Sequence, residues 1–327
     1  MLKKLTIHGF KSIERQTIAL GALNVLIGAN GSGKSNLLAA LAFFRASALG
    51  DRDWMVERAG GADRVLFHGK KNTKACFFAC ESASFHYEQT LLPVAGDRLE
   101  LDKDSGVDTA RQAIEGWRIY HLHDTSATAA VKSHCHVDDN RYLREDSANL
   151  AAYLYWLKQK HPTEYGRIVA TIQLTIPYFE DFVLAPLRRN EQMIRLEWKQ
   201  RHSDAYFDAD SLSDGSLRFV SLVTLLNQPP WSMPSLIVID EPELGLHPLA
   251  IRLLAEMLDA ASEHTQILLA TQSVTLLDHF PLEQVIVTEH DGKSSIFRRL
   301  NSADYQAWLD NYSTGALWEK NVLGGRP

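Results

Sequence analysis

The sequence predicts an α/β fold that is built around a phosphate-binding loop. The first observation is the segment Gly28-Ala29-Asn30-Gly31-Ser32-Gly33-Lys34-Ser35, which matches G-x-x-x-x-G-K-[ST] at every fixed position. The second is its setting, because a short apolar run at 23–27 precedes the loop and a segment of helical composition at 36–44 follows it. The third is an apolar run at 236–239 that ends in two carboxylates, as a buried parallel strand can.

The loop residues have separate expected tasks. The glycines let the backbone amides turn inward around phosphate groups, and the following helix adds its unpaired N–H groups and positive dipole end. Lys34 is expected to reach the β- and γ-phosphates of ATP, and the Ser35 hydroxyl to hold Mg²⁺. An accidental glycine-rich turn is the alternative, which the flanking strand and helix disfavour. The predicted ATP-binding residues here are Gly28, Ala29, Asn30, Gly31, Ser32, Gly33, Lys34, Ser35 and Asn36.

Two carboxylates close the second apolar run. Asp240 at the end of this strand is expected beside the Mg²⁺ ion, and Glu241 is expected to polarise the attacking water. Alone, such a run would fit a surface turn after a strand equally well. Together with the glycine loop it predicts Ser35 and Asp240 as metal ligands, and Lys34 and Glu241 as catalytic groups.

A third motif, Leu212-Ser213-Asp214-Gly215-Ser216-Leu217-Arg218, lies between the other two. In this order the motifs resemble those of the ATP-binding cassette (ABC) class of ATPases, with Walker A at 28–35, the signature at 212–218 and Walker B at 236–241. Transporters usually carry Leu-Ser-Gly-Gly-Gln, so the chain departs from them at Asp214 and Ser216. The resemblance implies that Ser213 and Gly215 contact the phosphates of ATP held by a second protomer, in an ATP-sandwiched homodimer.

Two further stretches fit the same class. The segment 243–248 resembles the D-loop that crosses between protomers, and 266–273 resembles the strand and switch position that senses the γ-phosphate. The switch residue is usually His, and here it is Gln272. Glutamine can donate a hydrogen bond to a phosphate, but it does not titrate, so it can neither take up a proton nor carry a charge. We therefore predict ATP binding with slow turnover, and count Gln272 among the catalytic residues.

Within the ABC class the chain most resembles the RecF, SMC and OLD-type branch and the stand-alone bacterial AAA-family ATPases. The opening at 5–13, the wording of 240–248 and the ending at 317–327 carry this resemblance. No sustained heptads occur, so a long coiled-coil arm is not expected. Little sequence follows the last core strand near Ile296, so the resemblance implies a separate effector, such as a TOPRIM-type nuclease, in place of a fused nuclease domain.

The spacing of the motifs predicts four parts. Residues 1–50 should form an N-terminal antiparallel β lobe with Walker A, and 51–205 an α+β insertion or lid. Residues 206–300 should complete a central mixed sheet flanked by helices, and 301–327 form a tail in which Trp318 packs on the core. Within the insertion we expect strands at 75–80, 84–88 and 193–198, and helices at 147–160 and 163–176.

Composition excludes several classes of protein. Apolar runs are too short for a membrane span, and 2–10 lacks the apolar core of a signal peptide. The three cysteines make no disulfide framework, which suits the cytoplasm. The net charge of −6 gives no general attraction to nucleic acid, so contact with DNA would have to be local. Candidates are Lys70, Lys71, Lys74, Arg188 and Arg189, for which ordinary surface charge is the simpler interpretation.

One competing site lies within the insertion. The segments 120–124 and 134–139 gather His, Cys and Asp, the residue types that bind Zn²⁺. Strand alternation would place His121 with His123, and His134 with His136. Their spacing matches no closed zinc template, so a hydrogen-bonding role is the preferred interpretation.

The predicted function is an ATP-dependent switch with Mg²⁺ as its cofactor. It would control a DNA-transaction or anti-phage defence effector, with DNA as a further partner. A scaffold or sensor without a DNA role is the first alternative. The motor subunit of an ABC transporter is the second.

Overall fold

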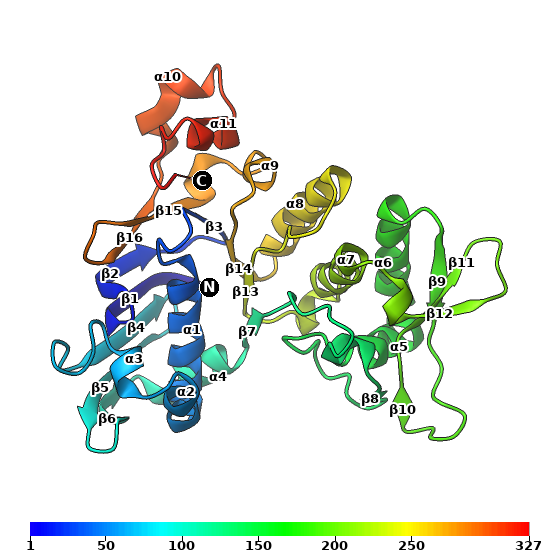
Figure 1. Cartoon of the computed structure of the whole chain (residues 1–327), viewed down its shortest axis with the longest axis horizontal. Coiled ribbons are helices and arrows are strands. Elements are labelled where there is room, and N and C mark those ends of the chain that lie inside the picture. Colours follow the sequence, from blue (N-terminus) through cyan, green and yellow to red (C-terminus); the bar gives the residue numbers. More distant parts are fainter. Residues whose placement is uncertain (327) are drawn as a thin grey trace. The chain divides into compact units, whose positions relative to one another are not determined.

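The computed structural model describes residues 1–326, apart from the side chains of 107–109, and contains two compact units (Figure 1). The first unit comprises 1–119, 234–241 and the described residues from 266 onward, and the second comprises 120–233 and 242–265. Pro327, the last residue of the predicted tail, lies outside the described residues.

The first unit contains the predicted antiparallel β lobe. Its strands alternate buried and exposed residues, so one face is buried. Strand β1 lies between β2 and β4, with Leu5 opposite Ile18 on one side and Cys80 on the other. The order in this sheet is β2 (Ile13–Ala19), β1 (Leu2–Phe10), β4 (Cys76–Ser82), β5 (His86–Val94) and β6 (Arg98–Ser105).

A mixed sheet forms the centre of the same unit. Strands β3 and β14 are buried along their whole length, as parallel strands covered on both faces are. Strands β15, β3, β14 and β13 pair in parallel, and β16 pairs antiparallel with β15. The order is β16 (Ser295–Arg299), β15 (Val285–His290), β3 (Leu23–Ile27), β14 (Gln266–Ala270), β13 (Leu236–Asp240) and β7 (Trp117–Tyr120).

One apolar core joins both sheets to α1. It includes Leu5 and Phe78 from the lobe, Phe44 from α1, and Leu26 and Val238 from the central sheet. The ring of Phe44 stacks on Phe78 at a centroid distance of 5.3 Å. The helices of this unit are α1 (Lys34–Leu49), α2 (Arg52–Arg58), α3 (Ala62–Val65), α4 (Val107–Glu115), α9 (Val274–Leu277), α10 (Gln306–Leu309) and α11 (Thr314–Glu319), with short 3₁₀ turns at Leu282–Gln284 and Ser302–Tyr305.

The second unit packs four helices with short strands. Residues 217–226 of α7 are buried, as their apolar density predicts. Trp198 stacks on Phe179 and Phe207 within a three-stranded sheet. The elements are α5 (Leu150–Lys160), α6 (Pro162–Thr175), α7 (Asp214–Leu226), α8 (Pro248–Ser262), the pair β8 (Cys135–His136) and β10 (Met193–Ile194), and the sheet β12 (Tyr206–Asp208), β11 (Glu197–Gln200) and β9 (Phe179–Val183), with 3₁₀ turns at Ala130–Lys132, Ala209–Ser211 and Pro230–Ser232. No helix within residues 1–326 is long and apolar enough to cross a membrane.

The structure divides the chain at other points than the predicted 51 and 205. Strands β4, β5 and β6 extend the lobe sheet from β1, so 51–119 belong to the first unit. The signature segment belongs to the second unit. Alternation in a sequence identifies a strand but not its partner, which explains the difference. The single strand expected at 193–198 is likewise two strands, β10 and β11, in different sheets.

Candidate nucleotide-binding site

The predicted phosphate loop joins β3 to α1, and glycine is required at both of its ends. Gly28 has φ 153° and Gly33 has φ 116°. A Cβ at Gly28 would lie 2.3 Å from the Thr288 carbonyl oxygen, and one at Gly33 would lie 2.1 Å from Ser295 Oγ. Side chains are therefore excluded where the backbone turns towards the helix.

The N-terminus of α1 is suited to an anion. Its first turn has no carboxylate, and Gly33 at the cap position supplies no side chain for the leading N–H groups. Those groups and the positive end of the helix dipole lie at the loop. The helix therefore offers the phosphate-binding geometry that the motif predicts.

Lys34 lies at one end of this loop. It is only 6% exposed, and its ammonium donates to the carbonyl oxygens of Gly28 at 2.5 Å and Ala29 at 3.0 Å. Burial lowers the pKa of Lys34, while the nearby carboxylates of Glu241 and Asp240 raise it. Phosphate oxygens would offer this buried ammonium charged acceptors in place of the neutral carbonyls.

The two predicted metal ligands approach each other. Ser35 Oγ, at the start of α1, donates to Asp240 Oδ2 at the end of β13 over 3.5 Å. Both groups present oxygen, the ligand atom that Mg²⁺ prefers. Their positions fit the predicted metal site.

The predicted water-polarising carboxylate touches the predicted switch residue. Gln272 Nε2 donates to Glu241 Oε1. Glu241 has φ 40°, a left-handed conformation that is uncommon for glutamate and costs about 1–3 kcal/mol. Its backbone N–H donates to the Ala270 carbonyl at 2.8 Å, so the strained turn is anchored to β14.

A hydroxyl network supports the loop from the lobe side. Asn36 donates to Ser12 Oγ at 2.7 Å, and Ser12 Oγ lies 2.7 Å from Ser295 Oγ. Ser295 then donates to the Ser32 carbonyl at 2.7 Å. Sequence reasoning missed Ser12 and Ser295, because isolated serines outside a motif carry no signal of their spatial neighbours.

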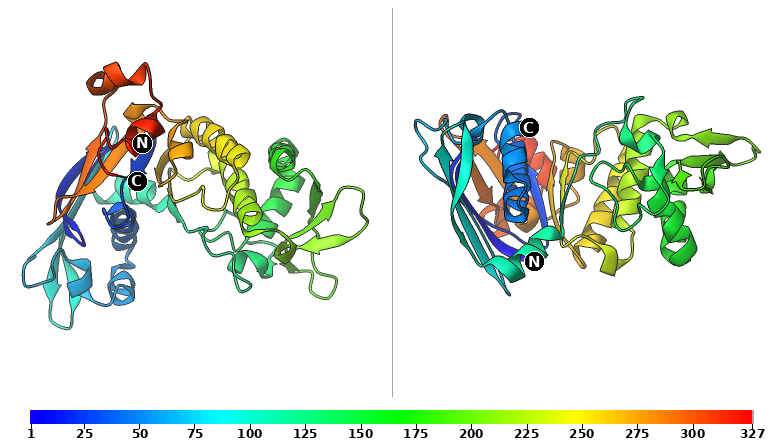
Figure 2. Two further views of the ribbon diagram at one scale, coloured as in Figure 1. Left: turned by 45° about the horizontal axis from the view of Figure 1, so that its top comes forward. Right: turned by 90° about the horizontal axis from the view of Figure 1, so that it is seen from below.

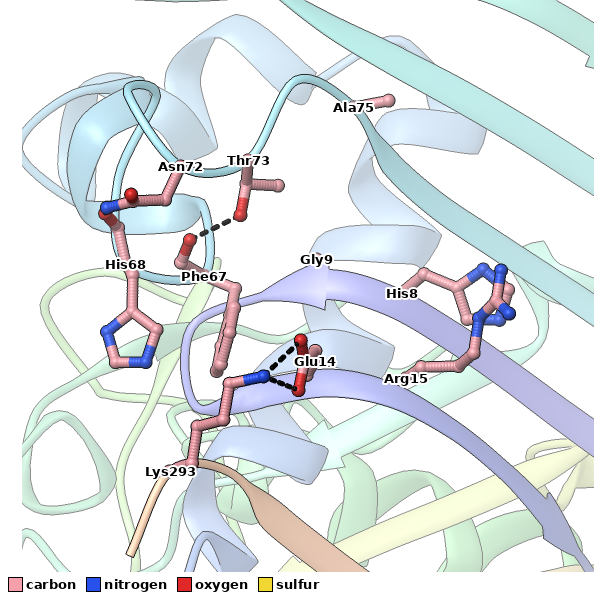
Figure 3. A pocket seen from close by; sticks show the side chains of 10 residues that line it. All are labelled: His8, Gly9, Glu14, Arg15, Phe67, His68, Asn72, Thr73, Ala75 and Lys293. Atoms are coloured by element: carbon pink, nitrogen blue, oxygen red, sulfur yellow. Dashed lines mark hydrogen bonds and ion pairs between the residues drawn. The ribbon is translucent and has the colours of Figure 1, made fainter.

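A large open pocket lies beside this network, on the lobe (Figure 3). Its volume is about 990 Å³. Lys293 and Glu14, which pair at 2.7 Å, line it together with His68 and Asn72 from the loop after α3. The residues that line the pocket come from separate segments of the chain, so no single sequence motif predicted the pocket.

The signature residues lie in the second unit, at the N-terminus of α7. Ser213 caps the helix, with its hydroxyl accepting the Ser216 N–H at 3.2 Å. A cavity of about 100 Å³ opens here, lined by residues that include Ser213, Gly215 and His247. A Cβ at Gly215 would lie 2.2 Å from the Gly245 carbonyl oxygen, so the signature and the predicted D-loop are in contact.

Arg218 joins this helix to the same loop. Its guanidinium donates to the carbonyl oxygens of Leu244, Leu122 (2.9 Å) and His123 (3.3 Å), and the residue is 6% exposed. Burial lowers the pKa of Arg218, whereas the nearby carboxylates of Asp214 and Glu243 raise it. The signature motif at 212–218 predicts no such role for its last residue, Arg218.

The alternative His and Cys cluster differs from its predicted form. Tyr120 ends β7, so His121 and His123 lie in irregular chain without strand alternation. The buried Cys135 thiol is directed at the Ile194 carbonyl, 3.7 Å away. In the described part of the chain no three His, Cys, Asp or Glu side chains gather as a metal site would require.

These features define a class of protein. A glycine loop between β3 and α1, with Asp240, Glu241 and Gln272 at the ends of β13 and β14, is the site of a P-loop ATPase of the ABC type. The antiparallel lobe and the signature helix complete that fold.

Comparison with known protein families supports the assignment to the ATPases. Residues 81–278 match the family described as "AAA domain, putative AbiEii toxin, Type IV TA system", and 1–90 match a family described as "AAA ATPase domain". The chain belongs to the first of these families. No curated protein matches it.

Solved structures with a similar fold include head domains of SMC proteins. One, an SMC head bound to the C-terminal winged-helix domain of ScpA, is 15% identical and has a TM-score of 0.66, with 93% of this chain and 99% of that chain covered. The SMC head of Pyrococcus furiosus with an extended coiled coil, bound to the C-terminal domain of ScpA, is 14% identical, with a TM-score of 0.62 and coverage of 94% and 98%. The SMC head of Thermotoga maritima is 14% identical, with a TM-score of 0.52 and coverage of 92% and 99%.

Proposed function

We propose that this protein is an ATP-binding and slowly ATP-hydrolysing switch that works as an ATP-sandwiched homodimer. The observation that carries the proposal is the gathering of Lys34, Ser35, Asp240, Glu241 and Gln272 around the N-terminus of α1. These groups supply a cation for the phosphates, two oxygens for Mg²⁺, a carboxylate for the attacking water and a donor for the γ-phosphate.

We propose dimerisation because the nucleotide motifs are divided between the two units of the chain. The phosphate loop and both carboxylates belong to the first unit, and Ser213 and Gly215 belong to the second. The start of α7 carries a small cavity and a positive dipole end, which suit the terminal phosphate of a nucleotide held by another copy. ATP would then complete the interface between two protomers.

Two contacts of the structure would change when ATP and Mg²⁺ are bound. Lys34 would exchange the carbonyls of Gly28 and Ala29 for phosphate oxygens. Gln272 would exchange Glu241 for the γ-phosphate, which frees the carboxylate to take a proton from water. Loss of the γ-phosphate after hydrolysis would remove the bridge and loosen the dimer.

The test is a Glu241→Gln variant. Glutamine keeps the shape but cannot accept a proton from water, so ATP should persist and trap the dimer. Light scattering with saturating ATP and Mg²⁺ should report twice the monomer mass for the variant, and monomer without nucleotide. Lys34→Ala is the matched control and should stay monomeric. A Glu241→Gln protein that remains monomeric with ATP bound would refute the sandwich.

The output is proposed to be a separate effector in a DNA transaction or in defence against phage, such as a nuclease. Two of the similar SMC heads were solved bound to a ScpA domain, which supports a partner protein for this fold. A purified protein whose ATPase rate rises with added DNA would support the DNA role. An ATPase rate that DNA leaves unchanged would favour the scaffold or sensor, an alternative that Gln272 also favours. A permease gene adjacent to the gene of this protein would favour the motor subunit of a transporter.

A further inference from the structure

The segment that follows α10 packs against the switch region of the first unit. Helix α11 lies beside α9, which begins directly after Gln272 and Ser273 (Figures 1 and 2). The Gly315 N–H donates to Asp278 Oδ1 at 2.7 Å, and Thr314 Oγ1 donates to the Phe280 carbonyl at 3.1 Å. Trp318 is fully buried, as expected for core packing. The segment is therefore part of the ATPase core.

Side chains hold the backbone that comes next. Trp318 Nε1 donates to the Gly325 carbonyl at 2.7 Å, and the Gly325 N–H donates to Glu289 Oε1 at 2.9 Å. Arg298 Nη2 donates to the Leu323 carbonyl at 2.8 Å. Three side chains from three elements, α11, β15 and β16, thus fix residues 323–325 in one position.

That position is in contact with the phosphate loop. A Cβ at Gly325, which has φ 60°, would lie 3.4 Å from Gly28 Cα and 2.7 Å from Val287 Cγ1. Glycine is what allows this approach. Because consecutive Cα atoms are about 3.8 Å apart, the Cα of Arg326 lies within about 9 Å of the Cα of Gly28.

Gly28 marks the end of the loop where the outer phosphates are expected. The Lys34 ammonium, the group that meets the β- and γ-phosphates, lies against the carbonyls of Gly28 and Ala29. Arg326 is exposed, and its guanidinium makes no hydrogen bond or ion pair with any residue in the described range 1–326. A guanidinium matches phosphate oxygens in geometry and charge.

We infer that Arg326 is a nucleotide-binding residue that contacts the terminal phosphate of ATP in the same chain. The inference deepens the proposed function and rests on ATP being the ligand of the loop. Trp318, Glu289 and Arg298 act as positioning residues, because they place the backbone that carries the arginine.

The experiment measures the affinity of the full chain for ATP and for ADP, each with Mg²⁺, by titration calorimetry. Arg326→Ala should weaken ATP binding about tenfold or more, the loss expected for a charged hydrogen bond, and weaken ADP binding less than about twofold. Arg326→Lys should recover only part of the ATP affinity, since a point charge replaces a planar fork. Arg201→Ala, which removes an exposed arginine of the second unit, is the matched control and should change neither affinity.

A second variant, Gly325→Ala, tests the position of Arg326 without removing its side chain. Gly325→Ala adds the Cβ that the contact with Val287 excludes, and should give the same selective loss for ATP with Arg326 intact. ATP affinity in Arg326→Ala equal to that of the wild type, or equal losses for ATP and ADP, would overturn the assignment while leaving the proposed function in place. A wild type that binds neither nucleotide would overturn both.

Discussion

At the scale of the residue, Gln272 sets the expected rate of turnover. Its amide donates to Glu241, the group proposed to take a proton from water, and it has no proton of its own to transfer. Gln272→His should therefore raise the steady-state ATPase rate by about tenfold, a fraction of what a well-placed acid–base group contributes. Gln272→Ala should lower the rate and leave ATP affinity within about twofold. Fast turnover in the wild type that Gln272→Ala abolishes and Gln272→His does not increase would contradict this role.

At the scale of the element, Arg218 makes the signature helix and the predicted D-loop one body. It donates to three backbone carbonyls while 6% exposed, so Arg218→Ala leaves buried acceptors without partners. We expect the free energy of unfolding to fall by about 2–4 kcal/mol, measured by urea denaturation. The ATPase rate should fall more than ATP affinity, because the loop residues 28–36 lie in the other unit.

The matched control for Arg218 is Arg252→Ala. Arg252 is an exposed residue of α8 that pairs with Glu256 over 3.7 Å, and its loss should cost less than about 0.5 kcal/mol. Arg218→Lys should resemble Arg218→Ala, because a single ammonium cannot reproduce the fork. Equal free energies of unfolding for Arg218→Ala and Arg252→Ala would show that the hydrogen bonds from Arg218 to the three carbonyls do not stabilise the fold.

At the scale of the whole molecule, the cysteines report whether both units are packed as described. Cys76, Cys80 and Cys135 are all buried and reduced. Burial raises the pKa of all three thiols, that of Cys80 to about 12 with a contribution from Glu81, so at pH 8 the reactive thiolate is nearly absent. The native protein should react with less than about one equivalent of a thiol reagent at pH 8, and with all three cysteines after denaturation. Rapid labelling of the native protein would contradict this packing.

The residues that the structure brings together at the candidate site could be predicted from local sequence. The Walker A residues, Asp240, Glu241 and Gln272 each belong to a continuous segment whose strand–loop pattern indicates its conformation. The structure places Ser35 near Asp240 and Glu241 on Gln272, which agrees with roles proposed from the motifs.

Local sequence was enough to identify the class of this protein, an ABC-type ATPase, since its nucleotide motifs are short and continuous and need only their own strands and helices. Three further features became visible only in the folded chain: residues 76–105 extend the N-terminal lobe, Ser12 and Ser295 support the loop, and Gly325 lies on Gly28. Each of these contacts joins residues distant in the chain. Pairing at that range is set by the register and packing of the complete core, which local patterns do not encode.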